Sequence, residues 1–329
     1  MSDRQITKKK LKKFLSSDLG VFFGALICCG LWGSAFPAVK IGMQELGITS
    51  AMIPTQILFA GCRFTCAGIA VVLIGSIMHH KPLYPKKSEF KKLGMLAPFQ
   101  TVGQYMPYYI GIAHTSGVNT SIVDSLSYFF SIVVACLIFR LEKITWKKFM
   151  GCALGFAGVI LISVDWGASL SFNMSFIGEG MILLSALSYS FSSVFAKIFS
   201  RDSNPVMLSG WQFFFGGLVI IAIGLLSGGH FDPWSGKAIA IFIYQVFIST
   251  CAYTLWTILL KYNDVSKVSI YGFLNPVFGV LLSALFLGES QGFQLKYLLA
   301  LVGISIGISL VNLKSKSQTH ANEMRKENQ

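Results

Sequence analysis

The chain carries one apolar sequence plan twice, and this repeat constrains the fold more than any other feature. Ser127–Glu142 (SYFFSIVVACLIFRLE) and Leu274–Glu289 (LNPVFGVLLSALFLGE) are both long apolar runs that end in a glutamate at the start of a loop. Similar segments precede them, Ser116–Val123 and Asn263–Ile270, and another apolar run follows each. The sequence therefore predicts an internal duplication of one membrane-spanning unit.

Composition places this repeat in a lipid bilayer. Of the 329 residues, 53% are hydrophobic and only 12% are charged, whereas a soluble domain carries about 25% charge. Only helices and closed barrels satisfy the backbone hydrogen bonds in lipid, and a spanning helix needs roughly 20 apolar residues. The apolar runs are too long and too uniform for barrel strands. We therefore expect an all-α integral membrane protein.

Ten apolar runs are long enough to be spanning helices. They lie near 19–40, 53–78, 93–113, 118–139, 147–165, 176–198, 205–227, 237–260, 265–287 and 293–313. Basic residues test this count, because lysine and arginine concentrate in cytoplasmic loops. With ten helices and a cytoplasmic N-terminus, the outside loops hold only Lys237 and Lys296. The sequence thus predicts a basic N-terminus (1–18) and a polar tail (314–329) that are both cytoplasmic.

The helix count gives the repeat a direction. Five helices, an odd number, separate equivalent positions, so residues 19–165 and 176–313 are predicted to be five-helix repeats of opposite orientation. Lys40 and Lys197 correspond in the same way. Inverted repeats suit alternating access, in which two mirrored halves open in turn around a site at the membrane midplane. The alternative is a duplication that only built a larger scaffold.

Several function classes are disfavoured. The net charge of +13 does not indicate a nucleic-acid partner, because the basic residues lie in loops between apolar runs. The seven cysteines lie inside those runs without a completing set of histidines or acids, so no metal or other cofactor is expected. Residues 303–307 match a hydrolase G-x-S-x-G motif, which needs a strand, a turn and a histidine base. Here the motif lies in an apolar run, so we expect no enzyme.

A set of motifs carries a family resemblance. They are LWGSAFPAVKIG (Leu31–Gly42), Arg63–Phe64 in the second apolar run, the two units that end in glutamate, and the stretch Tyr253–Glu289. Together they resemble the EamA-type family of the drug/metabolite transporter superfamily. One departure is Ser127–Phe130, where the family often has a proline in the fourth helix; the matching second-half residue, Pro276, is present.

The resemblance implies a ten-helix carrier whose halves surround a central cavity. It also implies a secondary transporter, an exporter or exchanger of small polar metabolites such as amino acids or amines, in a bacterial plasma (inner) membrane. A channel or a lipid scramblase is the alternative, although no ring of like charges, as found in many channels, is evident. The sequence leaves the oligomeric state, the substrate and the driving force open.

Asp124 is the most informative polar residue inside the apolar runs. It lies about six residues into the fourth predicted helix, or ~9 Å deep at a rise of 1.5 Å per residue. A charge in lipid is costly, so such acids face a cavity or a partner. Asp124 is therefore either a site for a proton or a substrate ammonium group, or a structural partner of Arg63. Arg63, in turn, is either an anchor for a substrate carboxylate or a tie between helices.

The third predicted helix carries a polar stripe. Gln100, Thr101, Gln104 and Tyr108 recur at helical spacing, and we expect this face to line a cavity rather than only to hydrogen-bond neighbouring helices. Weaker candidates for the same cavity are Trp32, Phe36, Tyr128, Tyr189, Tyr271 and Asn275, since aromatic residues in membrane helices more often serve packing. The glutamates near helix ends, Glu142, Glu179 and Glu289, are expected to be structural.

Overall fold

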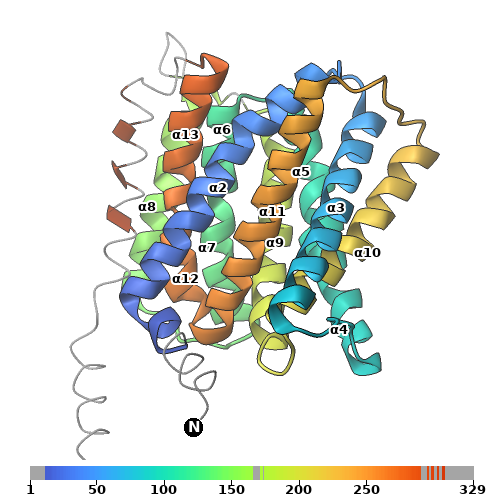
Figure 1. The fold of residues 1–329 in the computed structure, drawn as a ribbon. Coiled ribbons are helices and arrows are strands. Elements are labelled where there is room, and N and C mark those ends of the chain that lie inside the picture. Colours follow the sequence, from blue (N-terminus) through green and yellow to red (C-terminus); the bar gives the residue numbers. More distant parts are fainter. Residues whose placement is uncertain are drawn as a thin grey trace, which may run out of the picture.

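The computed structural model describes residues 12–165, 171–172 and 174–289, and a few positions between 295 and 307. These residues form a bundle of helices (Figure 1). The first half contains α2 (Asp18–Glu45), α3 (Ile53–His79), α4 (Lys87–Ala97), η1 (Pro98–Val102), α5 (Gly103–His114), α6 (Gly117–Asp124), α7 (Leu126–Val133), η2 (Val134–Ile138) and α8 (Trp146–Ser163). A short antiparallel ladder joins β1 (Val164–Asp165) to β2 (Ser171–Phe172). The second half contains η3 (Phe176–Gly180), α9 (Met181–Phe199), α10 (Pro205–Leu226), α11 (Gly236–Tyr262), α12 (Val265–Gly272) and α13 (Leu274–Leu287).

Every predicted helix from the first to the one near 265–287 is found at its expected place, and the third begins earlier, at Lys87. The tenth, near 293–313, falls outside the continuously described residues. Within the described part, seven helices are long and apolar enough to cross a membrane. Large apolar side chains also lie on the outer surface, such as Ile77 (72% exposed) and Leu226 (90% exposed). Such a surface suits lipid rather than water, and apart from the short ladder the described residues form a helical membrane protein.

Local sequence signals fix several helix ends. The side chains of Ser116, Asn204 and Ser235 accept hydrogen bonds from backbone N–H groups at the starts of α6, α10 and α11. These residues therefore satisfy donors that have no partner inside the helix. Gly288 follows α13 with φ of 68°, a left-handed conformation that glycine adopts without strain.

The fourth and ninth predicted helices are each interrupted near the middle, at Ser125 and Phe273. The Ser125 N–H donates to the carbonyl of Ile122 at 3.1 Å, and the Phe273 N–H donates to the carbonyl of Ile270 at 3.3 Å. Both are the tighter, three-residue bonds of a 3₁₀ turn. The first interruption forms without a proline, and the Ser125 hydroxyl also donates to the Ile122 carbonyl. The two copies thus share a geometry that they reach with different residues.

Helices α3 and α10 touch backbone to backbone along one flank of the bundle (Figure 1). A Cβ atom placed on Gly61 of α3 would lie 2.6 Å from the backbone nitrogen of Ile221 in α10. A Cβ atom on Gly217 of α10 would lie 2.5 Å from the backbone nitrogen of Thr65 in α3. No side chain fits between the two helices at these points, so glycine is required there. We call this contact the glycine seam.

Candidate functional site

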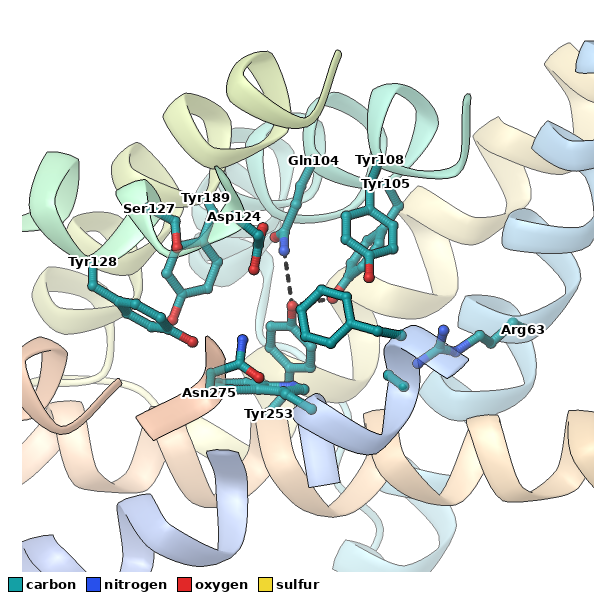
Figure 2. A pocket seen from close by; sticks show the side chains of 13 residues that line it. Arg63, Gln104, Tyr105, Tyr108, Asp124, Ser127, Tyr128, Tyr189, Tyr253 and Asn275 are labelled. Carbon is teal, nitrogen blue, oxygen red and sulfur yellow. Dashed lines mark hydrogen bonds between the residues drawn. The ribbon is translucent and has the colours of Figure 1, made fainter. Parts of the chain in front are cut away.

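A cavity lies at the centre of the bundle, between helices of both halves (Figure 2). It is lined by Trp32, Ala35, Phe36, Arg63, Gln104, Tyr105, Tyr108, Asp124, Ser127, Tyr128, Tyr189, Tyr253 and Asn275. Its volume of about 40 Å³ holds a few water molecules, since one water needs roughly 10–15 Å³ on this measure. The cavity is therefore contracted in this structure, and a molecule much larger than water would enter only if the surrounding helices moved apart.

Most of the residues that the sequence singled out meet in this cavity. The exceptions are Gln100 and Thr101, which are buried within η1, and Tyr271, whose ring packs against Phe22 with 5.8 Å between centroids. The sequence reasoning missed Ala35, Tyr105, Ser127 and Tyr253, which complete the lining. Tyr105 adjoins the polar stripe, and Tyr253 begins the stretch that carries the family resemblance; no stronger signal marks either residue.

Asp124 lies at the C-terminal end of α6, half-buried at the cavity wall. Figure 2 shows its carboxylate beside Gln104 and Tyr189, with Arg63 across the cavity. Within the residues that the structure describes, the Asp124 carboxylate makes no hydrogen bond and no ion pair. The suggested structural pair with Arg63 is therefore not formed in this state.

Arg63 is instead a tie between three helices. Its Nη1 donates to the hydroxyl of Tyr109 in α5 at 2.8 Å, and its Nη2 donates to the hydroxyl of Ser249 in α11 at 3.0 Å. Its Nε donates to the backbone carbonyl of Gln245 at 3.2 Å, and the guanidinium lies 5.1 Å from the ring centroid of Phe64. All three nitrogens of this 3% exposed side chain are engaged by neutral partners. These contacts fit the interpretation of Arg63 as a tie between helices.

Tyr253 is the polar centre of the cavity. Its hydroxyl oxygen accepts a hydrogen bond from Gln104 Nε2 at 2.9 Å and another from the Tyr105 hydroxyl. Its ring meets that of Trp32 edge to face, with 4.9 Å between centroids. These contacts join α11 to α5 and α2 across the cavity.

Several buried polar atoms of the lining have no hydrogen-bond partner among the described residues. They are Trp32 Nε1, Gln104 Oε1, the Tyr189 hydroxyl and Asn275 Oδ1. An unsatisfied buried polar group costs about 1–3 kcal/mol. Together with Asp124, these atoms form a polar set that water or a ligand would complete.

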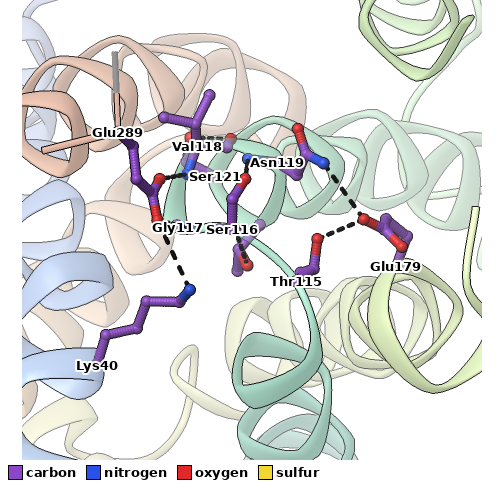
Figure 3. A network of polar contacts seen from close by, with 10 residues as sticks. Lys40, Thr115, Ser116, Gly117, Val118, Asn119, Ser121, Glu179 and Glu289 are labelled. Carbon is purple, nitrogen blue, oxygen red and sulfur yellow. Dashed lines mark hydrogen bonds and ion pairs between the residues drawn. The ribbon is translucent and has the colours of Figure 1, made fainter. Parts of the chain in front are cut away.

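Two glutamates close opposite ends of the bundle in equivalent ways. At one end, the Glu289 carboxylate accepts from the backbone N–H groups of Gly117 and Val118, both at 2.9 Å, and lies 3.6 Å from Lys40 Nζ (Figure 3). These N–H groups begin α6, where an acid is favoured by the helix dipole. We call this arrangement the Glu289 clamp.

The second arrangement, the Glu142 clamp, joins α12 to the end of η2. The Glu142 carboxylate accepts from the backbone N–H of Ser266 at 3.2 Å and from Lys148 Nζ at 2.9 Å. Each clamp thus links the glutamate that ends an apolar run of one sequence copy to the start of a short helix from the other copy. Both acids have the structural contacts that the sequence led us to expect.

Glu179 lies near the Glu289 clamp, in the first turn of η3. It accepts from the backbone N–H of Ser175 at 3.0 Å and from Asn119 Nδ2 at 3.3 Å, and the Thr115 hydroxyl also donates to it (Figure 3). The acid satisfies donors at the start of its helix and ties that start to α6. Its expected structural role agrees with these contacts.

Comparison with known proteins adds an independent line of evidence. The sequence profile of the EamA-like transporter family matches residues 19–164 and again 176–313. The chain is 27% identical over 304 residues to the uncharacterized transporter YvbV of Bacillus subtilis, covering 88% of this chain and 91% of that protein. It is 26% identical over 279 residues to the uncharacterized inner membrane transporter YedA of Escherichia coli, covering 82% and 83%.

Two further comparisons concern a plant protein and a solved structure. The chain is 27% identical over 290 residues to a chloroplastic WAT1-related protein of Arabidopsis thaliana, covering 85% of this chain but only 66% of that protein. A crystal structure aligns with 91% of this chain and 97% of its own, with a TM-score of 0.65 and 19% identity. At this identity the likeness concerns the fold alone.

Proposed function

Because this chain belongs to the EamA-like transporter family, we propose that it is a secondary transporter of small polar metabolites, such as amino acids or amines. One observation carries this proposal: the central cavity is lined by both sequence copies and contains a carboxylate, Asp124, without a protein partner among the described residues. Burying such a group costs stability. A ligand that enters the cavity would offset that cost.

The proposed architecture is ten spanning helices in two inverted five-helix repeats, over 19–165 and 176–313, with both termini in the cytoplasm. The double match of the family supports the duplication. The paired helix interruptions at Ser125 and Phe273 and the two glutamate clamps support a correspondence between the copies. Figure 1 shows α6 and α12 toward opposite ends of the bundle, as inversion requires.

The proposed mechanism is alternating access around the central cavity, leading to export or exchange. The contracted cavity is then the occluded state, in which both clamps are formed. Release of the Glu289 clamp would open one side, and release of the Glu142 clamp would open the other. Because the clamps are separate sets of contacts, each is free to open while the other stays closed.

Transport by purified protein in liposomes tests this function. A panel of radiolabelled amino acids and amines is measured for uptake and for counterflow, with and without a pH gradient. We expect saturable uptake that is accelerated by unlabelled solute on the opposite side, as a carrier requires. Tyr271→Phe, a change outside the cavity, should transport at the wild-type rate.

Two outcomes would overturn the proposal. Folded protein that moves no solute from the panel would argue against a metabolite carrier. Flux that neither saturates nor shows counterflow would indicate a channel, and movement of labelled lipid without solute would indicate a scramblase.

A further inference from the structure

The lining of the cavity is predominantly aromatic. Its rings belong to Trp32, Phe36, Tyr105, Tyr108, Tyr128, Tyr189 and Tyr253. Neighbouring rings meet edge to face or at a tilt, with centroids 4.9 Å apart for Trp32 and Tyr253 and 6.1 Å apart for Tyr128 and Tyr189. The faces of such rings attract cations, and most strongly where water is excluded. The walls therefore favour a positively charged ligand with an apolar body.

The charges of the lining point in the same direction. Asp124 is the one carboxylate among the residues that line the cavity, and it has no ion-pair or hydrogen-bond partner in the described part of the chain. Arg63 is the one cation among the described residues of the lining, but its three nitrogens already donate to α5 and α11. The cavity thus offers a free anchor for an ammonium group and an occupied one for a carboxylate.

The unsatisfied polar atoms agree with this asymmetry. Gln104 Oε1 and Asn275 Oδ1 are acceptors, the Tyr189 hydroxyl can accept or donate, and Trp32 Nε1 is the single atom of this set that can only donate. Figure 2 shows Gln104 beside the Asp124 carboxylate and Asn275 below it, near Tyr253. An ammonium group brings hydrogen-bond donors and no acceptors. A donor is the partner that these oxygens lack.

We propose that the cavity selects organic cations, with the ammonium group at Asp124 and an aromatic or aliphatic body against the rings, and that it discriminates against ligands that carry a carboxylate. This inference rests on the proposed function and narrows its substrate class from amino acids or amines to amines. An amino acid would bring its carboxylate into a cavity where Arg63, the one cation among the described lining residues, is engaged elsewhere.

A matched set of three ligands tests the selectivity. Phenethylamine, phenylalanine and 3-phenylpropionate share a phenyl body and differ in charge, as a cation, a zwitterion and an anion. Binding to the purified protein in nanodiscs is measured by calorimetry, so that the result does not depend on transport. We expect phenethylamine to bind at least about 30-fold more tightly than phenylalanine, the ratio that corresponds to ~2 kcal/mol for a charge-assisted hydrogen bond. We expect 3-phenylpropionate not to bind.

Variants assign the effect to the carboxylate. Asp124→Asn should weaken phenethylamine binding by about 30-fold, and Asp124→Glu should restore part of the affinity because it keeps the charge. Glu45→Gln is the matched control, since Glu45 pairs with the exposed Lys237 and lies away from the cavity. Melting temperatures of all variants identify any that fail to fold.

The inference is overturned if phenylalanine or 3-phenylpropionate binds as tightly as phenethylamine, or if folded Asp124→Asn keeps wild-type affinity for the amine. Its failure is separable from that of the proposed function. Saturable transport of a zwitterion or an anion would leave a carrier with a different selectivity. Tight amine binding without transport of any solute would instead leave the cation site and remove the carrier.

Discussion

The Glu289 clamp allows a quantitative prediction about how one end of the bundle is held closed. Gly117 and Val118 are the first residues of α6, so their N–H groups have no acceptor within the helix. Their protection from exchange with solvent therefore depends on the Glu289 carboxylate, which accepts from both at 2.9 Å. Glu289→Gln keeps the shape of the side chain but removes its charge and one of its two oxygens.

The magnitude follows from these two bonds. A hydrogen bond to a charged group contributes about 1.5–3 kcal/mol, against about 0.5–1.5 kcal/mol for a neutral one. In the variant one hydrogen bond is lost and the other is weakened. Water bonds the freed N–H group and offsets part of the lost free energy, which leaves a net loss of about 2 kcal/mol. That loss raises the equilibrium constant for opening roughly 30-fold. The proposed occluded state should shift toward the state open at this end by the same factor.

Hydrogen–deuterium exchange of the protein in nanodiscs measures this shift. In Glu289→Gln, the amides of Gly117 and Val118 should exchange roughly 30-fold faster than in the wild type. Glu142→Gln is the matched control at the other end, where it should accelerate exchange at Ser266 and leave Gly117 and Val118 unchanged. Unchanged exchange at Gly117 and Val118 in Glu289→Gln would refute the role of the clamp, as would equal acceleration by both variants.

Three further perturbations address the seam and the cavity. Gly217→Ala should cost about 1–3 kcal/mol through overpacking and lower the melting temperature, because the new Cβ meets the Thr65 backbone. The control Gly30→Ala, with open space around it, should leave the melting temperature unchanged. Equal melting temperatures for the two variants would contradict the glycine seam. Tyr253→Phe should weaken amine binding about fivefold by calorimetry, in line with a lost hydrogen bond of ~1 kcal/mol; an unchanged affinity would remove Tyr253 from the site. Arg63→Lys should destabilise the fold by about 1–3 kcal/mol, because an ammonium does not reproduce the guanidinium fork and leaves a buried hydrogen bond unmade. Lost transport with unchanged melting would instead indicate ligand contact.

The sequence predicted helix positions well because apolar run length and loop chemistry are local properties. It also named Trp32, Asp124, Tyr189 and Asn275 as candidates, with a pair to Arg63 as the alternative for Asp124, and all four line the cavity. These signals require no knowledge of how the helices pack. They are therefore readable before the fold is known.

The polar stripe of the third predicted helix shows where this reasoning stops. A uniform helix would put Gln100, Thr101, Gln104 and Tyr108 on one face. The structure has a π-helical turn, η1, whose wider turn rotates the helix beyond it. As a result Thr101 donates to Gln212 in α10, while Tyr105 joins Gln104 and Tyr108 at the cavity.

The partners of Arg63 lay beyond prediction for a different reason. Asp124 and the actual acceptors on α5 and α11 were all compatible with its depth in the membrane. Only the distances between helices select among them, and those distances arise from packing across the whole bundle. The same holds for Tyr253, which one sequence cannot separate from other intramembrane tyrosines.

The glycine seam also sets the mechanics of any motion between the two halves. Since α3 and α10 have no layer of side chains between them, sliding one along the other would drive bulky groups over the partner's backbone, whereas tilting about their line of contact keeps the glycines in place. Helices α3 and α10 would thus serve as the axis of a tilting motion on one flank of the bundle. Helices α8 and α13 lie on the opposite flank (Figure 1), so they travel farthest for a given tilt. Glu289 follows α13 and Glu142 precedes α8, so a tilt about the glycine seam would displace these two clamps more than the contacts near the seam.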